Sequence, residues 1–72
     1  METYLIITDS TGKQYPYLIS DTPLSVSDFT VTSDQHNLDL FEQALDTKNT
    51  IRVGDRIFRT EHIIEVNIVT RQ

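Results

Sequence analysis

The chain has 72 residues, of which 38% are hydrophobic and 24% charged, with two glycines, two prolines and no cysteine. A chain of this length forms one domain, and its mixed composition excludes a disordered, collagen-like or low-complexity protein. Because so small a domain buries little of its surface, an enzyme with a deep substrate cavity is not expected. The sequence predicts one folded domain over residues 1–72.

The lack of cysteine bears on the compartment. It removes disulfides, on which small secreted domains usually depend, and so favours a reducing cytoplasm. No stretch approaches the roughly 18 apolar residues of a membrane span. The first residues also lack the basic and apolar regions of a signal peptide. We therefore expect a cytoplasmic protein that does not associate with membranes.

Charge is distributed unevenly along the chain. Residues 1–46 carry eight acidic side chains and one lysine, whereas residues 47–72 carry five basic and three acidic side chains. The favoured interpretation is internal complementarity, with basic C-terminal strands beside the acidic part of the fold. The alternatives are an acidic face for a basic partner or a basic hairpin for an anionic one.

The first predicted element is a β-hairpin over residues 3–19, with strands over residues 4–7 and 14–19. Gly12 suits the left-handed position of a loop that combines a type I turn with a G1 bulge, which places Asp9 opposite Lys13. Pro16 cannot donate a hydrogen bond to a neighbouring strand, which predicts an edge or a bulge. The register predicts one face with Leu5, Ile7, Tyr15, Tyr17 and Ile19, and an opposite face with Tyr4, Ile6, Pro16 and Leu18.

Two apolar faces on one hairpin limit the architecture. A strand buried on both sides belongs either to a curled, barrel-like sheet or to a sheet whose second face meets another subunit. Residues 20–33, rich in Ser, Thr and Asp, predict a loop that ends in a short strand over residues 29–31. Residues from about 37 to 46 predict a helix. Apolar residues recur there at steps of three and four, at Leu38, Phe41, Ala44 and Leu45.

The C-terminal residues 50–69 predict three strands. A Gly54-Asp55 turn separates the first two, and a single helical turn near residues 60–62 precedes the third. In the third strand Ile64, Val66 and Ile68 are predicted on a dry face that alternates with a wet one. The predicted order is β-β-(β)-α-β-β-β in an α+β domain of mostly antiparallel strands. The expected fold is a strongly curled sheet or an SH3-like, partly open barrel of about five strands with one helix.

Few residues suit catalysis or metal binding. His36, Asp34 and Asp39 could gather one nitrogen and two oxygens around a divalent metal, but helix capping is the favoured interpretation of acidic residues at a helix start. The chain has no strained serine elbow of the G-x-S-x-G type, and its two glycines are each explained by a turn. We expect no enzyme activity, no cofactor and no metal.

The tyrosines and arginines support two binding hypotheses. Tyrosine is enriched at interface hot spots, although a core position with the hydroxyl at the rim is its commoner role. The candidate interface residues are Tyr4, Tyr15 and Tyr17. Arginines of the basic hairpin could contact phosphates, although the net charge of −5 opposes attraction to nucleic acid. The candidate nucleic-acid contacts are Arg52, Arg56 and Arg59.

The sequence alone does not name a biological role. We expect a small, non-catalytic interaction module that binds a protein partner or associates with itself, such as a homodimeric accessory protein of bacterial or phage origin. This follows because the apolar strand surface exceeds what one helix can cover. The alternative is a small nucleic-acid-binding protein that uses the basic C-terminal hairpin.

Overall fold

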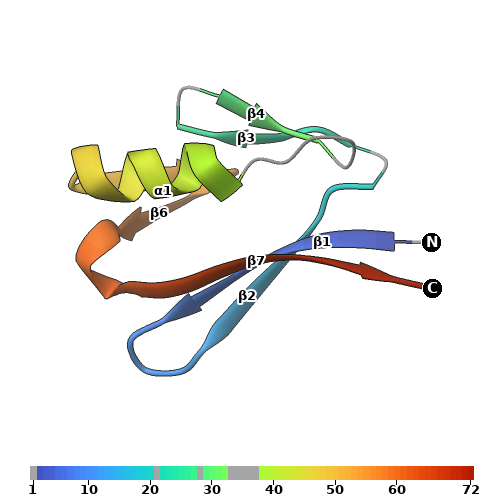
Figure 1. Ribbon diagram of the computed structural model, residues 1–72, viewed down its shortest axis with the longest axis horizontal. Helices are drawn as coiled ribbons and strands as arrows, with labels where there is room; N and C mark the ends of the chain where they lie inside the picture. Colours follow the sequence, from blue (N-terminus) through green and yellow to red (C-terminus); the bar gives the residue numbers. More distant parts are fainter. Residues whose placement is uncertain (1, 21, 28, 33–37) are drawn as a thin grey trace.

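The computed structural model describes residues 2–20, 22–27, 29–32 and 38–72. The strands form two antiparallel sheets: sheet A has the order β2-β1-β7 and sheet B the order β4-β3-β5-β6. Figure 1 shows sheet A in the lower part of the view, with sheet B and the helix above it. The elements are β1 (Glu2–Asp9), β2 (Gln14–Leu18), β3 (Leu24–Val26), β4 (Phe29–Val31), α1 (Leu38–Thr47), β5 (Thr50–Val53), β6 (Arg56–Arg59), the 3₁₀ turn η1 (Thr60–His62) and β7 (Ile63–Arg71).

This architecture shows that the predicted fold was wrong. Within the described residues the strands form two distinct sheets that are not strongly curled, and these do not close into an SH3-like barrel. The order is β-β-β-β-α-β-β-β, and the protein is mostly strand. Curling was inferred from the two apolar faces of the first hairpin. The structure accommodates them differently, because it packs one face into the core and leaves the other outside.

The predicted pairing and turn of the β1–β2 hairpin are confirmed, although β1 is longer than predicted and β2 ends at Leu18. Gly12 has a φ of +87°, its N–H donates to the Asp9 carbonyl at 3.0 Å, and the Asp9 N–H donates to the Lys13 carbonyl at 3.0 Å. These bonds define the predicted type I turn with a G1 bulge. Pro16 lies opposite Ile6 in β2, which is an edge strand of sheet A. Its missing N–H is tolerated there because the outward side of an edge strand needs no partner.

The short strand predicted at the end of the segment over residues 20–33 is confirmed as β4, but the part predicted as a loop also contains β3, which pairs with β4 in a further hairpin. Val26 of β3 also pairs with Val53 of β5, and the Ser27 N–H donates to the Arg52 carbonyl at 2.7 Å. Strand β3 has only three residues, too few for a recognisable alternation. Its formation depends on pairing with a strand about 25 residues away, which a local pattern does not reveal.

Helix α1 covers the open side between the two sheets. Phe41 is only 1% exposed, and its ring meets the Phe29 ring edge-on with centroids 5.7 Å apart. Ala44 is buried beside it, whereas Leu38, at the start of the helix, is 45% exposed. The helix was predicted over residues 37–46, of which residue 37 lies outside the described residues.

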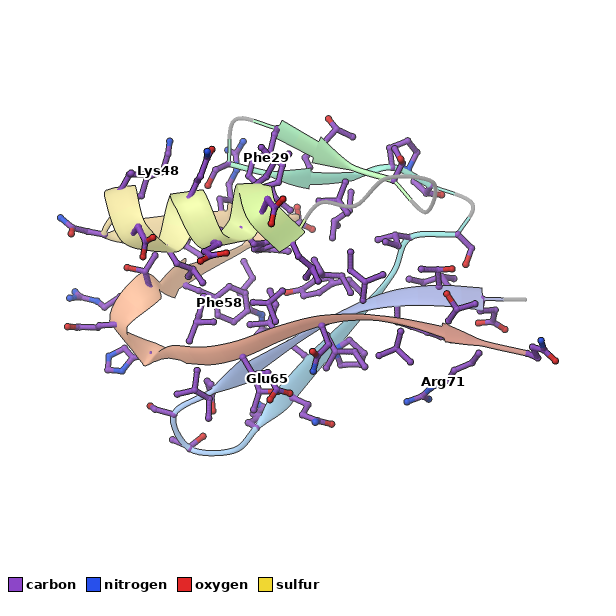
Figure 2. The ribbon with its side chains drawn as sticks, in the orientation of Figure 1. Phe29, Lys48, Phe58, Glu65 and Arg71 are labelled. Atoms are coloured by element: carbon purple, nitrogen blue, oxygen red, sulfur yellow. The ribbon has the colours of Figure 1, made fainter. Side chains whose placement is uncertain are left out.

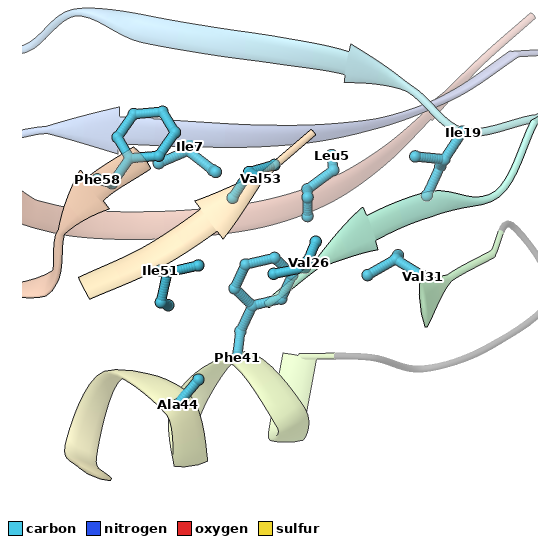
Figure 3. Packing of buried hydrophobic residues seen from close by; sticks show 10 residues of the cluster. All are labelled: Leu5, Ile7, Ile19, Val26, Val31, Phe41, Ala44, Ile51, Val53 and Phe58. Atoms are coloured by element: carbon cyan, nitrogen blue, oxygen red, sulfur yellow. The ribbon is translucent and has the colours of Figure 1, made fainter. Parts of the chain in front are cut away.

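The core lies where sheet A, sheet B and α1 converge. Figure 3 shows its side chains pointing toward one another from all three layers. Sheet A contributes Leu5 and Ile7, both without exposed surface. The remaining buried apolar residues are Ile19, Val26, Val31, Phe41, Ala44, Ile51, Val53 and Phe58.

The last strand departs from the predicted alternation at its beginning. Glu65 pairs with Thr8, but Asp9 pairs with Ile63, so the register shifts at this point. The shift turns Ile63 toward the core and leaves Ile64 65% exposed. The prediction that Ile64 lies on the dry face was therefore wrong, because a bulge reverses the facing of residues on one side of it. The predicted single helical turn is confirmed as η1.

Candidate interaction surface

The outer face of sheet A, the side that points away from sheet B, is apolar at its centre. Register places Tyr4 between Leu18 and Val69 in one row across the three strands. The next row contains Pro16, Ile6 and the exposed amide Asn67. Leu18 is 47% exposed, and the Tyr4, Ile6 and Val69 side chains are partly exposed. Sheet B and α1, which cover sheet A in the described part of the chain, lie on its other side (Figure 2).

Charged side chains flank this apolar centre at the two ends of β7. Glu65 lies in the row of Thr8, and Arg71 lies in the row of Glu2 at the opposite end. The Arg71 guanidinium carbon lies 5.6 Å from the centroid of the Tyr4 ring. The Tyr4 hydroxyl donates to the Glu2 carboxylate, and this hydrogen bond raises the pKa of Tyr4. The outer face thus has one end with the acidic Glu65 and an opposite end where the basic Arg71 lies beside Glu2.

Tyr15 lies on the opposite, inner face of the hairpin. Its ring packs edge-on against Phe58 with centroids 5.1 Å apart, and its hydroxyl donates to Asp9 Oδ2 at 3.1 Å. The Lys13 ammonium and the Arg56 guanidinium carbon lie 5.1 and 4.9 Å from the ring centroid. Burial, together with the hydrogen bond to Asp9, raises the pKa of Tyr15. Tyr15 therefore joins sheet A to β6 within the molecule.

Tyr17 lines a groove between the β2 edge and the turn that joins β5 to β6. The groove has a volume of ≈ 450 Å³ and is lined by residues 14–17 and 53–56. Burial raises the pKa of the Tyr17 phenol. The three candidate tyrosines therefore do not form one surface: Tyr4 lies on the outer face, whereas Tyr15 and Tyr17 lie on the inner side of the hairpin.

The three candidate arginines also face different ways. Arg52 pairs with Ile57, which is 68% exposed, so both lie on the outer side of sheet B. Arg59 lies two residues from Ile57 and shares that side. Arg56 lies on the other side and over the Tyr15 ring. The structure brings Arg52 and Arg59 to one side and separates Arg56 from them.

A hollow on the outer side of sheet B is lined by a second cationic residue, Lys48, as well as by Arg52. It has a volume of ≈ 610 Å³, and Lys48, Arg52 and Ile57 are among its lining residues. Arg59 instead lines a smaller hollow with Thr60 and Glu61. The carboxylate of Glu61 reduces the positive potential around Arg59.

The metal site proposed from the sequence falls largely outside the described residues. His36 and Asp34 lie outside them, and Asp39 lies in the first turn of α1. In the described ranges no group of three or more His, Asp or Glu side chains could hold a metal ion. None of the helices in those ranges has the length and apolar character needed to cross a membrane.

Comparison of the chain with protein-family models, curated proteins and solved structures finds no match. Two residues of the outer face of sheet A, Glu65 and Val69, were not among the sequence candidates. They join Tyr4 only through the pairing of β7 with β1. The signal that sequence reasoning did contain was the apolar second face of the first hairpin.

Proposed function

We propose that the protein is a non-catalytic interaction module that associates with a second copy of itself through the outer face of sheet A. The observation that supports the proposal is that one sheet has apolar residues on both sides, while the described residues cover only one side. Contiguous exposed apolar surface with a polar rim is typical of protein-binding sites. A cytoplasmic location, favoured by the lack of cysteine, belongs to the same proposal.

A second copy is the favoured occupant because the face is complementary to itself. Its central rows are apolar except for Asn67, Glu65 lies at one end, and Arg71 lies at the other end beside Glu2. A two-fold interface uses the same patch on both subunits. A patch that carries both charges can therefore pair its acidic residue with the basic residue of the other copy, and its basic residue with the acidic one. The face spans only three strands, and its interface should be smaller than the standard of roughly 1,600 Å². We therefore expect a concentration-dependent dimer.

The test compares two exposed aliphatic residues on different sheets. Leu18→Asp places a charge on the proposed interface, whereas Ile57→Asp places the same charge on the outer side of sheet B. Sedimentation velocity over a concentration series should show the wild type moving from monomer to dimer. Leu18→Asp should remain monomeric and Ile57→Asp should dimerise like the wild type. A wild type that stays monomeric up to millimolar concentration, or equal behaviour of the two variants, would contradict the proposal.

Nucleic-acid binding is the competing outcome. The same samples are titrated with fluorescent single-stranded and duplex DNA and RNA at two salt concentrations. We expect no binding at physiological ionic strength, because the arginines are divided between two sides and the net charge is −5. Micromolar, salt-dependent binding that is lost in an Arg52→Ala, Arg59→Ala double variant would replace the proposed function with the alternative.

A further inference from the structure

The charges on the outer face lie in an order along β7 that distinguishes its two ends. Glu65 and Arg71 are six positions apart, which corresponds to about 20 Å of strand. Between them lie the rows that contain Ile6 and Tyr4. Each charge is held by a neighbour on the same face: the Asn67 amide donates to Glu65, and the Arg71 guanidinium lies over the Tyr4 ring.

Two packed sheets keep their strand directions within about 30° of each other, so two symmetric arrangements are available. A two-fold axis perpendicular to the strands, in the plane between the sheets, places each strand antiparallel to the same strand of the other copy. The rows of the two copies then run in opposite order. Glu65 of each copy then faces Arg71 of the other, and the Tyr4 row packs on the Ile6 row. If the two-fold axis runs parallel to the strands, the rows of the two copies run in the same order. In that arrangement β1 runs parallel to its copy and Glu2 faces Glu2.

We infer that the two copies meet with β7 antiparallel to β7, oriented by reciprocal ion pairs between Glu65 of one copy and Arg71 of the other. This inference rests on the proposed function. The antiparallel arrangement gains two attractive contacts at the rim, whereas the parallel one places like charges together. Rim charges select orientation and partner more than they add affinity, because solvent screens them. The apolar centre provides the association, and the two ends of β7 decide its direction.

The experiment uses two charge reversals, Glu65→Arg and Arg71→Glu, first alone and then mixed. In either single variant, both end contacts of a homodimer join like charges. In a mixed dimer, one copy has arginine at both positions and the other has an acid at both, so both contacts become attractive. Native mass spectrometry or sedimentation should show at least tenfold weaker association of each variant alone and recovery in the equimolar mixture.

Mixing separates this effect from damage within one chain. Glu65→Arg also loses the contact with Asn67, and Arg71→Glu loses the contact with the Tyr4 ring. Mixing two folded chains cannot repair such losses, so recovery reports contacts between copies. The matched control pair is Glu61→Arg and Arg59→Glu, two exposed residues that line one hollow and lie outside the paired rows of sheet A. Since each variant keeps a net negative charge, overall attraction cannot explain recovery, and the control mixture should behave like its components.

The outcomes distinguish this inference from the proposed function. A wild type that dimerises while the Glu65→Arg and Arg71→Glu mixture gains nothing over its components overturns the orientation and leaves self-association in place. Recovery on mixing together with an undisturbed Leu18→Asp dimer means that the copies meet along the edges of β7, which overturns the face-to-face arrangement. A wild type that never associates overturns both. Recovery on mixing, with Leu18→Asp monomeric, supports both.

Discussion

The two faces of sheet A are built from alternate residues of the same strands, yet they have different surroundings. Along β1, Leu5 and Ile7 have no exposed surface, whereas Tyr4 and Ile6 remain partly exposed. The difference comes from what lies opposite each face, since sheet B and α1 cover only the inner one. Hydrophobicity of a strand therefore does not report its burial. Even a chain of 72 residues has apolar side chains that stay partly exposed within the described part of the fold.

The largest expected effect comes from removing the ring of α1 that helps to cover the inner face. Phe41→Ala should lower the free energy of unfolding by about 3 kcal/mol or more, because it leaves a cavity among buried side chains. Urea denaturation followed by circular dichroism measures the loss. The control is Leu40→Ala on the exposed side of the same helix, where Leu40 is 39% exposed. A loss below about 0.5 kcal/mol for Phe41→Ala would contradict the packing described for α1.

The second prediction compares the faces directly with one substitution. Leu5→Ala on the inner face should cost about 2–5 kcal/mol of unfolding free energy, as buried leucines do. Leu18→Ala on the outer face should cost less than about 1 kcal/mol in dilute solution, because its side chain stays partly in water. At high concentration the same Leu18→Ala change should weaken dimerisation. Equal destabilisation of the dilute monomer by both changes would mean that the outer face is covered by the chain itself.

The smallest effect concerns the loop end of the inner face, where Asp9 accepts the Tyr15 hydroxyl. A hydrogen bond from the Thr11 hydroxyl is the main cause that lowers the pKa of Asp9 below 3.8, and the Lys13 and Thr11 N–H groups add to it. Because the folded pKa lies below the unfolded one, the carboxylate contributes stability above the unfolded value. This contribution is lost as the pH falls through the folded pKa.

Thr11→Val removes the hydroxyl donor and should raise the pKa of Asp9 toward its ordinary value. The contribution of Asp9 to stability should then be smaller than in the wild type, and its loss on acidification should be complete at a higher pH. Carboxyl ¹³C NMR of Asp9 measures the shift, and Thr30→Val, on an exposed position of β4, is the control. An unchanged Asp9 titration in Thr11→Val would show that the backbone donors alone hold the carboxylate.

Local features of the fold were predictable because short-range geometry encodes them. Gly12 permits the left-handed turn conformation, and the turn then sets which residues of β1 and β2 share a face. The spacing of Phe41 and Ala44 predicts the buried stripe of the helix. Of the candidate surface, the sequence identified Tyr4 and its apolar neighbours on the hairpin. It also placed Tyr15 and Tyr17 on the face opposite Tyr4, but it did not show which of the two faces sheet B and α1 would cover.

The amino-acid sequence by itself determined the first hairpin with its two apolar faces, the helix and the turn at Gly54. The tertiary structure decided which face was covered, how β3 joined β5, and where the bulge turned Ile64 outward. Each of these outcomes depends on pairing between strands far apart in the chain, such as β1 with β7. Such pairing depends on which arrangement of the strands buries the most apolar surface. A local sequence pattern includes only one of the two strands that form each contact, so it does not determine the pairing.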